Sequence, residues 1–176
     1  SPQAAVAHVL RRTGFLAHPS QVAGWAERGP AALLEDRLNG EAVEAPDWKL
    51  SEDWEDYERA VAWMLDRFRD PNAGLHERMT WFWHDHFAVS MQVVRHLPAM
   101  LAHLELCWSL GRGDVRALIR QVTTDAAMLV FLDGATSKGT APNENFGREL
   151  LELYTVGVGN FTEADVKAAA AALTGW

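Results

Sequence analysis

The chain has 176 residues, 48% of them hydrophobic and eight of them tryptophan, so it can bury a core and is not a disordered protein. Its single cysteine, Cys107, excludes an intrachain disulfide framework, and no run of residues is long and apolar enough to predict a membrane span. The formal net charge is −8, and residues 41–58 hold eight acidic residues against one lysine, which argues against a nucleic-acid-binding surface.

Apolar residues recur with the helical period from the N-terminus onward, and proline, glycine and capping residues separate the repeats. In the first half of the chain this pattern predicts helices over residues 2–12, 20–28, 31–38, 54–69 and 75–90. Ser20 is expected to cap the second of them, and Pro30 suits the first turn of the third. The segment 40–50 is acidic and contains a proline, and we expect a loop there.

The second half continues the helical pattern. It predicts helices over residues 98–111, 114–122, 125–132, 144–156 and 168–173. Thr162 followed by Asp165 has the spacing of a capping box, and no alternating run indicates a strand. The sequence therefore predicts an all-α protein, an irregular array of about nine or ten short to medium helices in a single domain over residues 1–176.

Two histidines lie in the aromatic segment WFWHDHF, residues 81–87. A His-x-His pair binds one metal ion from a strand, but on a helix the two side chains are about 200° apart, so His84 and His86 are not expected to share an ion. His86 falls on the apolar side of the helix. There it is either a core histidine bonded to a carboxylate or a backbone carbonyl, or a metal ligand or general base. His84 lies nearly opposite, and we interpret it as structural or exposed.

A polar stripe follows further along the chain. Asn145, Arg148, Glu149 and Glu152 are spaced i, i+3, i+4, i+7, so a regular helix would place them on one face. The stripe is a solvated face of ion pairs, a buried ion-pair network, or a metal or catalytic site. Carboxylates and a histidine from two helices can hold iron, manganese or zinc, although the absence of a Glu-x-x-His motif weakens that interpretation.

Two further features have ordinary structural interpretations. The loop over residues 133–142 contains Gly134, Lys138 and Gly139 and can cradle an anion near a helix N-terminus, but it lacks the phosphate-loop spacing and is by default a mobile surface loop. Cys107 lies among leucines and a tryptophan, so we expect it to be a buried small hydrophobic residue.

Three blocks of sequence resemble a known family. They are HVLRRTGF from His8, ERMTWFWHDHFAVS from Glu77, and the long block from Asp125 to Trp176 that contains NENFGRELLELYTVG. The chain resembles the bacterial "domain of unknown function 1800" family over most of its length. The W-H-x-H-F and N-E-N-F-x-R-E-L-L-E-L-x-T-x-G patterns are long and specific.

The resemblance implies a predominantly helical protein without an established activity. Members often carry export signals and are often encoded beside a second exported family, so a periplasmic or extracellular location and an exported protein partner are expected. Members usually continue well past the T-G-W block, which implies that residues 1–176 are the N-terminal part of a longer protein. The family's motif residues correspond here to His84, His86, Asn143, Glu144, Asn145, Arg148, Glu149 and Glu152.

Our leading hypothesis is an exported helical protein with a divalent metal site. His86 would be a ligand or base, Glu149 and Glu152 carboxylate ligands, and Arg148 the group that orients an anion. If the protein is an enzyme, His86, Arg148 and Glu149 are the catalytic candidates, and metal-assisted hydrolysis or oxidation are the reaction classes. The hypothesis requires the two motif helices to meet.

The competing hypothesis is a non-catalytic interaction module. Its acidic segment and its tryptophans would face an exported protein partner or a cell-envelope polymer, and the polar stripe would only hold two helices together. Self-association would follow if the fold leaves apolar surface exposed.

Overall fold

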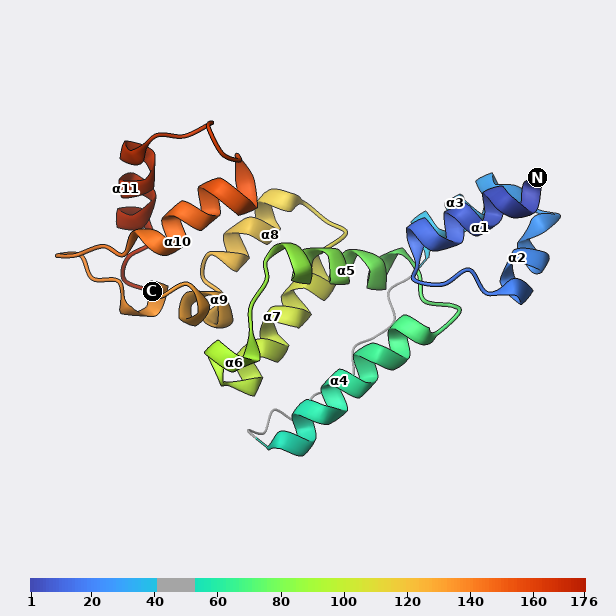
Figure 1. Ribbon diagram of the computed structural model, residues 1–176, viewed down its shortest axis with the longest axis horizontal. Coiled ribbons are helices and arrows are strands. Elements are labelled where there is room, and N and C mark those ends of the chain that lie inside the picture. The colour runs from blue at the N-terminus through green and yellow to red at the C-terminus, as the bar shows by residue number, and fades with distance from the viewer. Residues whose placement is uncertain (41–52) are drawn as a thin grey trace. The chain divides into compact units, whose positions relative to one another are not determined.

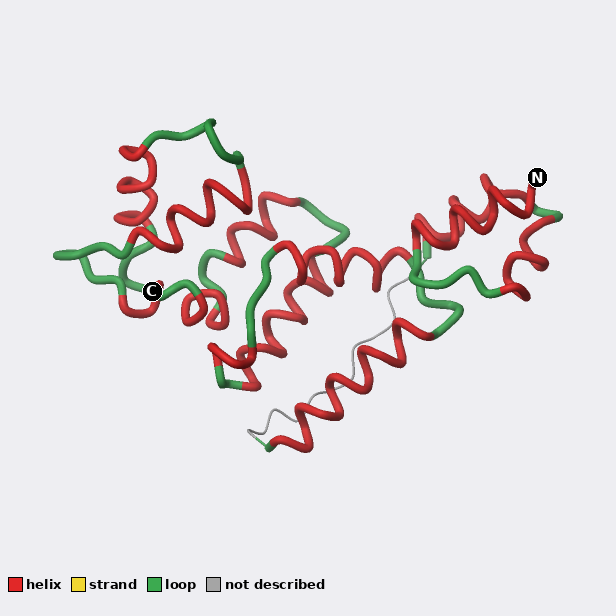
Figure 2. Tube along the Cα trace, in the orientation of Figure 1, coloured by secondary structure: helices red, strands yellow, loops and turns green. Residues whose placement is uncertain are grey.

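The computed structural model describes residues 1–40 and 53–176, and the predicted acidic loop lies, apart from Gly40, outside them. Over the described residues the chain forms eleven α-helices, one 3-10 turn and one π-helix. The same residues contain no strand, only an isolated bridge between Lys138 and Ala141. Figures 1 and 2 show the helices and the loops that join them. The prediction of an all-α protein is confirmed.

The chain groups into two compact units, Ser1–Phe82 and Trp83–Trp176, and the division falls inside helix α5 (Leu75–His86). The single domain expected over the whole chain stays a prediction. Length and hydropathy together exclude a membrane-crossing helix within residues 1–40 and 53–176.

Three short helices begin the first unit: α1 (Pro2–Thr13), α2 (Pro19–Ala26) and α3 (Gly29–Asn39). Each has a proline in its first turn, where the missing N–H costs no hydrogen bond. Their shared core is Val6, Leu10 and Leu33. The N-cap of α2 is His18 and not the predicted Ser20, because Pro19 takes the first helical position; the Ser20 hydroxyl bonds to His18 Nδ1 at 2.7 Å.

Helix α4 (Trp54–Arg69) has the predicted bounds and is capped by Asp53, whose side chain accepts from the amide of Glu55. A buried ion pair joins it to α5: Arg67 binds Glu77, which is only 3% exposed. The other carboxylate oxygen of Glu77 accepts from the amide of Gly74 at 2.8 Å. Burial alone would raise the pKa of Glu77, but the hydrogen bonds from Arg67 and Gly74 outweigh it, so the pKa lies below its usual value.

Helix α5 ends at His86, four residues before the predicted end at residue 90. Ser90 caps a new helix instead, since its hydroxyl accepts from the amide of Gln92 at 3.3 Å. The resulting one-turn helix, α6 (Met91–Val94), was not expected from the sequence.

The second unit continues through α7 (Leu97–Leu110), α8 (Val115–Val122) and α9 (Ala126–Phe131). A 3-10 turn, η1 (Gly134–Thr136), leads to α10 (Glu144–Glu149), the π-helix η2 (Leu150–Thr155) and α11 (Glu163–Ala172). The core of the unit is Phe87, Leu118, Val122, Met128, Leu129, Leu132, Phe146 and Tyr154. The predicted capping box is present at the start of α11, where Thr162 and Asp165 exchange hydrogen bonds.

Helices α10 and α11 lie side by side (Figure 1) because Gly147 lets their backbones approach. A Cβ atom at Gly147 would lie 2.9 Å from the amide nitrogen of Ala170 and 3.2 Å from the carbonyl oxygen of Val166. These neighbours are backbone atoms and cannot rotate away, so only glycine fits.

We expect Glu77→Ala to destabilise the first unit by about 3 kcal/mol, because it leaves the Arg67 guanidinium partly buried without its main partner. Chemical denaturation followed by circular dichroism measures this. Asp66→Ala, at an exposed acidic residue next to Arg67 on α4, is the control and should change stability by less than about 0.5 kcal/mol.

The same pair predicts an acid dependence. Because the folded-state pKa of Glu77 lies below the reference value of 4.5, its contribution is complete above pH 4.5 and is lost as the pH falls through the lowered pKa. The wild type should therefore lose more stability than Glu77→Gln between pH 4.5 and strong acid. Parallel losses in both proteins would show that this carboxylate has an ordinary pKa.

Gly147→Ala should destabilise the second unit by about 1–3 kcal/mol, since α10 and α11 must separate to admit the methyl group. Gly139→Ala is the matched control, because a Cβ there meets nothing within 4 Å. Thermal unfolding of both variants measures the difference, and equal stability would exclude a close helix contact at Gly147.

Candidate functional site

The helix that carries the polar stripe changes its hydrogen-bond register midway. Asn143 caps α10, and the chain continues without a break into the π-helix η2. There the amide of Val156 bonds to the carbonyl of Leu151, five residues back, at 3.1 Å. A π-turn is rare and is often found at functional sites. It pairs residues five apart, so Glu149 and Tyr154 come together in place of the i, i+3 and i, i+4 neighbours of a regular helix.

At the π-turn, Glu149 has one carboxylate oxygen that is shielded from solvent and lacks a hydrogen-bond donor in the described part of the chain. Its Oε2 atom is inaccessible to solvent and accepts no hydrogen bond from any described residue. The carboxylate lies close enough to Tyr154 to act on its phenol: burial, followed by the charge of Glu149, raises the pKa of Tyr154. A shielded carboxylate oxygen without a donor is costly in a protein and marks a place where a partner is needed.

His86 reaches the same turn from the end of α5. Its Nε2 atom lies 3.2 Å from the backbone oxygen of Tyr154, and its ring packs against those of Trp83, Phe87 and Tyr154. A carbonyl oxygen only accepts, so Nε2 is the donor in this bond. The two motif helices therefore meet. The bond to a backbone carbonyl agrees with the interpretation of His86 as a core histidine.

Arg148 is held by two carboxylates. Its guanidinium donates two bonds of 2.8 Å to Glu163 and one of 3.3 Å to Glu144. The hydrogen bond to Glu163 is the main reason why the pKa of Arg148 rises further above its usual value. Arg148 thus joins α10 to α11 through exposed ion pairs, the first of the interpretations open for the stripe.

The remaining stripe residues separate. The side-chain amide of Asn145 donates to the carbonyl of Leu132 at 3.4 Å, while Glu152 lies in the π-turn and forms no hydrogen bond or ion pair with a described residue. Within residues 1–40 and 53–176, no three His, Cys, Asp or Glu side chains are arranged to hold one metal ion. A metal held by His86, Glu149 and Glu152 stays a prediction, and those side chains would have to reorient around it.

His84 belongs to a different cluster, so the two histidines of the motif diverge as the helix predicts. Its ring lies 5.6 Å from that of His103, and burial, with the nearby His103, lowers its pKa to about 4. His103 is fully buried and bonds to Asp125 at 3.0 Å. Asp125 also caps α9, because its side chain accepts from the amide of Met128 at 2.9 Å.

Cys107 completes this cluster, with its Sγ atom 3.9 Å from Nε2 of His103. The cysteine is fully buried, which confirms the prediction of a small buried residue. Burial, followed by the charge of Asp125, raises the pKa of the thiol to about 12. The Cys–His–Asp series is therefore not an activated nucleophile, because such a nucleophile needs a lowered pKa.

The loop before α10 is tied down at Ser137. Its hydroxyl bonds to that of Thr174 at 2.7 Å and accepts from the amide of Asn143 at 3.0 Å. Three residues of the loop form the turn η1. The expected mobile loop is thus anchored at its middle.

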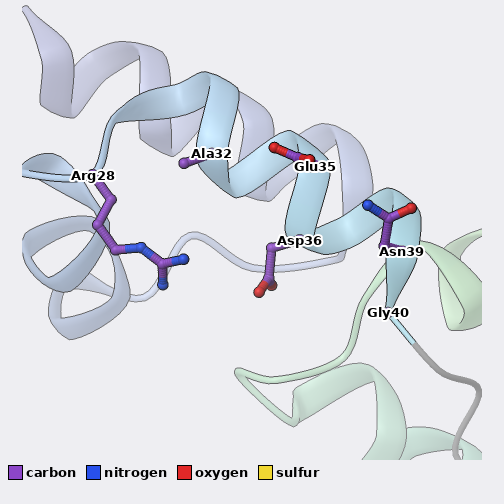
Figure 3. A pocket seen from close by; sticks show the side chains of 6 residues that line it. All are labelled: Arg28, Ala32, Glu35, Asp36, Asn39 and Gly40. Atoms are coloured by element: carbon purple, nitrogen blue, oxygen red, sulfur yellow. The ribbon is translucent and has the colours of Figure 1, made fainter.

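The first unit has a hollow of about 350 Å³ along α3 (Figure 3). Arg28, Ala32, Glu35, Asp36, Asn39 and Gly40 line it. Its charged side chains are exposed to solvent, and the Arg28 guanidinium lies 4.0 Å from the ring centre of Trp25. We interpret the hollow as a shallow depression in the solvent-exposed surface of α3 and not as a binding site.

The fold and this site define an all-α protein whose distinguishing feature is a π-turn that brings together a glutamate, a tyrosine and a histidine. The family described as "Protein of unknown function (DUF1800)" matches residues 8–176. The chain therefore belongs to this family, as the sequence blocks indicated. No curated protein and no solved structure matches the chain.

We expect Cys107 to be almost inert toward Ellman's reagent in the folded protein. A pKa of about 12 in place of 9.0 lowers the thiolate fraction about a thousandfold at neutral pH. The reaction should be at least about a hundredfold faster in denaturant, and the single thiol makes the readout unambiguous. Rapid stoichiometric labelling of the native protein would place the thiol at the surface.

Proposed function

We propose that the protein binds a divalent metal ion at the π-turn, with Glu149 as the principal ligand. The observation that carries this proposal is the shielded Oε2 atom of Glu149, which lacks a hydrogen-bond donor among the described residues. A cation is the partner that suits such an oxygen best, since it neutralises the charge and satisfies the lone pairs at once.

The donor set fits this class of ion. Carboxylate oxygen and imidazole nitrogen are ligands for manganese, iron and zinc. His86, whose Nε2 atom bonds to the carbonyl of Tyr154, would be the imidazole ligand. That bond fixes the tautomer and the ring orientation, as outer partners commonly do for histidine ligands. Glu152, on the same turn, would supply a further carboxylate after rotation of its side chain.

The other residues have supporting roles in this proposal. Arg148 is a positioning residue, since its bonds to Glu163 and Glu144 hold α10, and therefore Glu149, against α11. The buried phenol of Tyr154 keeps its proton at neutral pH, because its pKa is raised. A bound metal would supply Lewis acidity for hydrolysis or oxidation, with His86 and Glu149 beside it.

The family resemblance supports a location outside the cytoplasm, periplasmic or extracellular, where this domain would act with an exported partner.

An alternative function is that of a non-catalytic interaction module. Three apolar side chains near the end of the π-turn favour it: Leu153, Val156 and Val158 are 59%, 47% and 75% exposed. Such side chains are suited to a protein partner.

The proposal predicts that Glu149→Gln weakens metal binding at least about tenfold. Metal content after purification without chelator is measured by inductively coupled plasma mass spectrometry, and affinity for manganese, zinc and iron by calorimetry. The substitution removes an uncompensated charge, so it should not destabilise the metal-free fold.

Glu105→Gln, at an exposed glutamate of the same unit, is the matched control and should change neither quantity. If Glu149→Gln lowers stability while metal content and affinity stay the same, the glutamate has a structural role and the interaction module is the better function.

A further inference from the structure

One side of α4 presents large apolar side chains that the rest of the first unit leaves exposed to solvent; we call it the apolar face of α4. Trp54, Val61 and Leu65 are 62%, 40% and 53% exposed. They are spaced i, i+7, i+11 and therefore lie on one side of the helix. On its other side, α4 buries Ala60 in its middle, and near its end Arg67 binds Glu77 and Phe68 contacts Phe15 and Trp81.

A surface of this kind needs an occupant. A helix of 16 residues gains most of its stability from packing an apolar face, and a tryptophan and a leucine in water contribute nothing to it. We propose that this face binds the same face of a second copy of the chain, with the two α4 helices antiparallel.

Two charges at the edge of the apolar face select this partner and this direction. Glu58 lies in the N-terminal half of the helix and Arg69 in its last turn, and both are exposed on the side of Leu65. By contrast, Arg67 and Asp56 point away from this face and are paired with Glu77 and Arg59. An antiparallel pair places Glu58 of each helix beside Arg69 of the other, and also opposes the helix dipoles. A parallel pair would place like charges together.

The apolar face of α4 and its edge are also complementary in shape to a second copy. The exposed side chains are spaced i, i+4, i+7 and i+11, so they form one row along the helix: Glu58, Ala62, Leu65 and Arg69. When Glu58 of one copy lies opposite Arg69 of the other, Ala62 lies opposite Leu65. A small residue then faces a large one at both places related by the two-fold axis, which is the pattern of a self-complementary interface.

Sedimentation equilibrium and light scattering on the chain test this pairing. The wild type should show twice the 19.6 kDa of one chain at high concentration and dissociate on dilution. E58R and R69E each place like charges opposite one another and should weaken association at least about tenfold. Glu105→Arg, at an exposed glutamate of α7, is the matched control and should leave association unchanged.

Mixing the two single variants gives the decisive result. In a mixed pair both charge contacts are again complementary, so E58R and R69E should associate with each other as tightly as the wild type with itself. The double variant E58R/R69E should also recover self-association. Circular dichroism confirms that each variant is folded.

Three results would overturn the proposal: a wild type that is monomeric at every concentration, a dimer that neither single variant weakens, or single variants that fail to associate when mixed. The first of these would mean that the α4 face has another occupant, and the second that the chain dimerises through another surface.

Discussion

The second unit depends on one change in backbone hydrogen bonding, the widening of the helix at Leu150. Before this residue the chain is an α-helix capped by Asn143, and after it the carbonyl of Leu151 accepts from an amide five residues on. This shift brings the carboxylate of Glu149 to Tyr154 and presents the carbonyl of Tyr154 to His86. A regular helix would not place residues five apart on one face.

Around this turn, a few specific contacts hold the helices together in addition to the hydrophobic core. The glycine at 147 lets α10 and α11 approach, and the guanidinium at 148 joins them from the side. The first unit also has a specific contact between helices: Arg67 of α4 and Glu77 of α5 form an ion pair that is largely shielded from solvent. Short helices make such contacts necessary, because each presents little apolar area.

Much of the fold was predictable because its signals are local. The helical period of the apolar residues and the residues that flank it predicted the bounds of α4. The spacing of Thr162 and Asp165 predicted the capping box at the start of α11. The π-turn was not predictable, since LLELYT is a good α-helical sequence and only its packing requires the wider register. The wider register also moves Glu152 out of the position that a regular helix would give it relative to Asn145, Arg148 and Glu149.

In the candidate site, too, some features could be predicted from local sequence and others depend on packing. The meeting of the two motif helices was expected, but the partner of Arg148 is Glu163, fifteen residues away on another helix, and no local pattern indicates it. The buried roles of Glu77 and His103 were also missed, because a glutamate or histidine within a helical repeat is usually solvated. Their burial is visible only when the neighbouring helices are in place.

The wider turn also has a consequence for how this segment tolerates changes of length. A hydrogen bond that spans five residues contains one residue more than the α-helical bond, so removing one residue between Leu150 and Thr155 would restore a regular helix. All that follows would then rotate by about 100° relative to Glu149, including Gly157, whose positive φ of 81° follows the end of the turn. Chain length within these six residues, as much as their identity, therefore determines whether the glutamate, tyrosine and histidine meet.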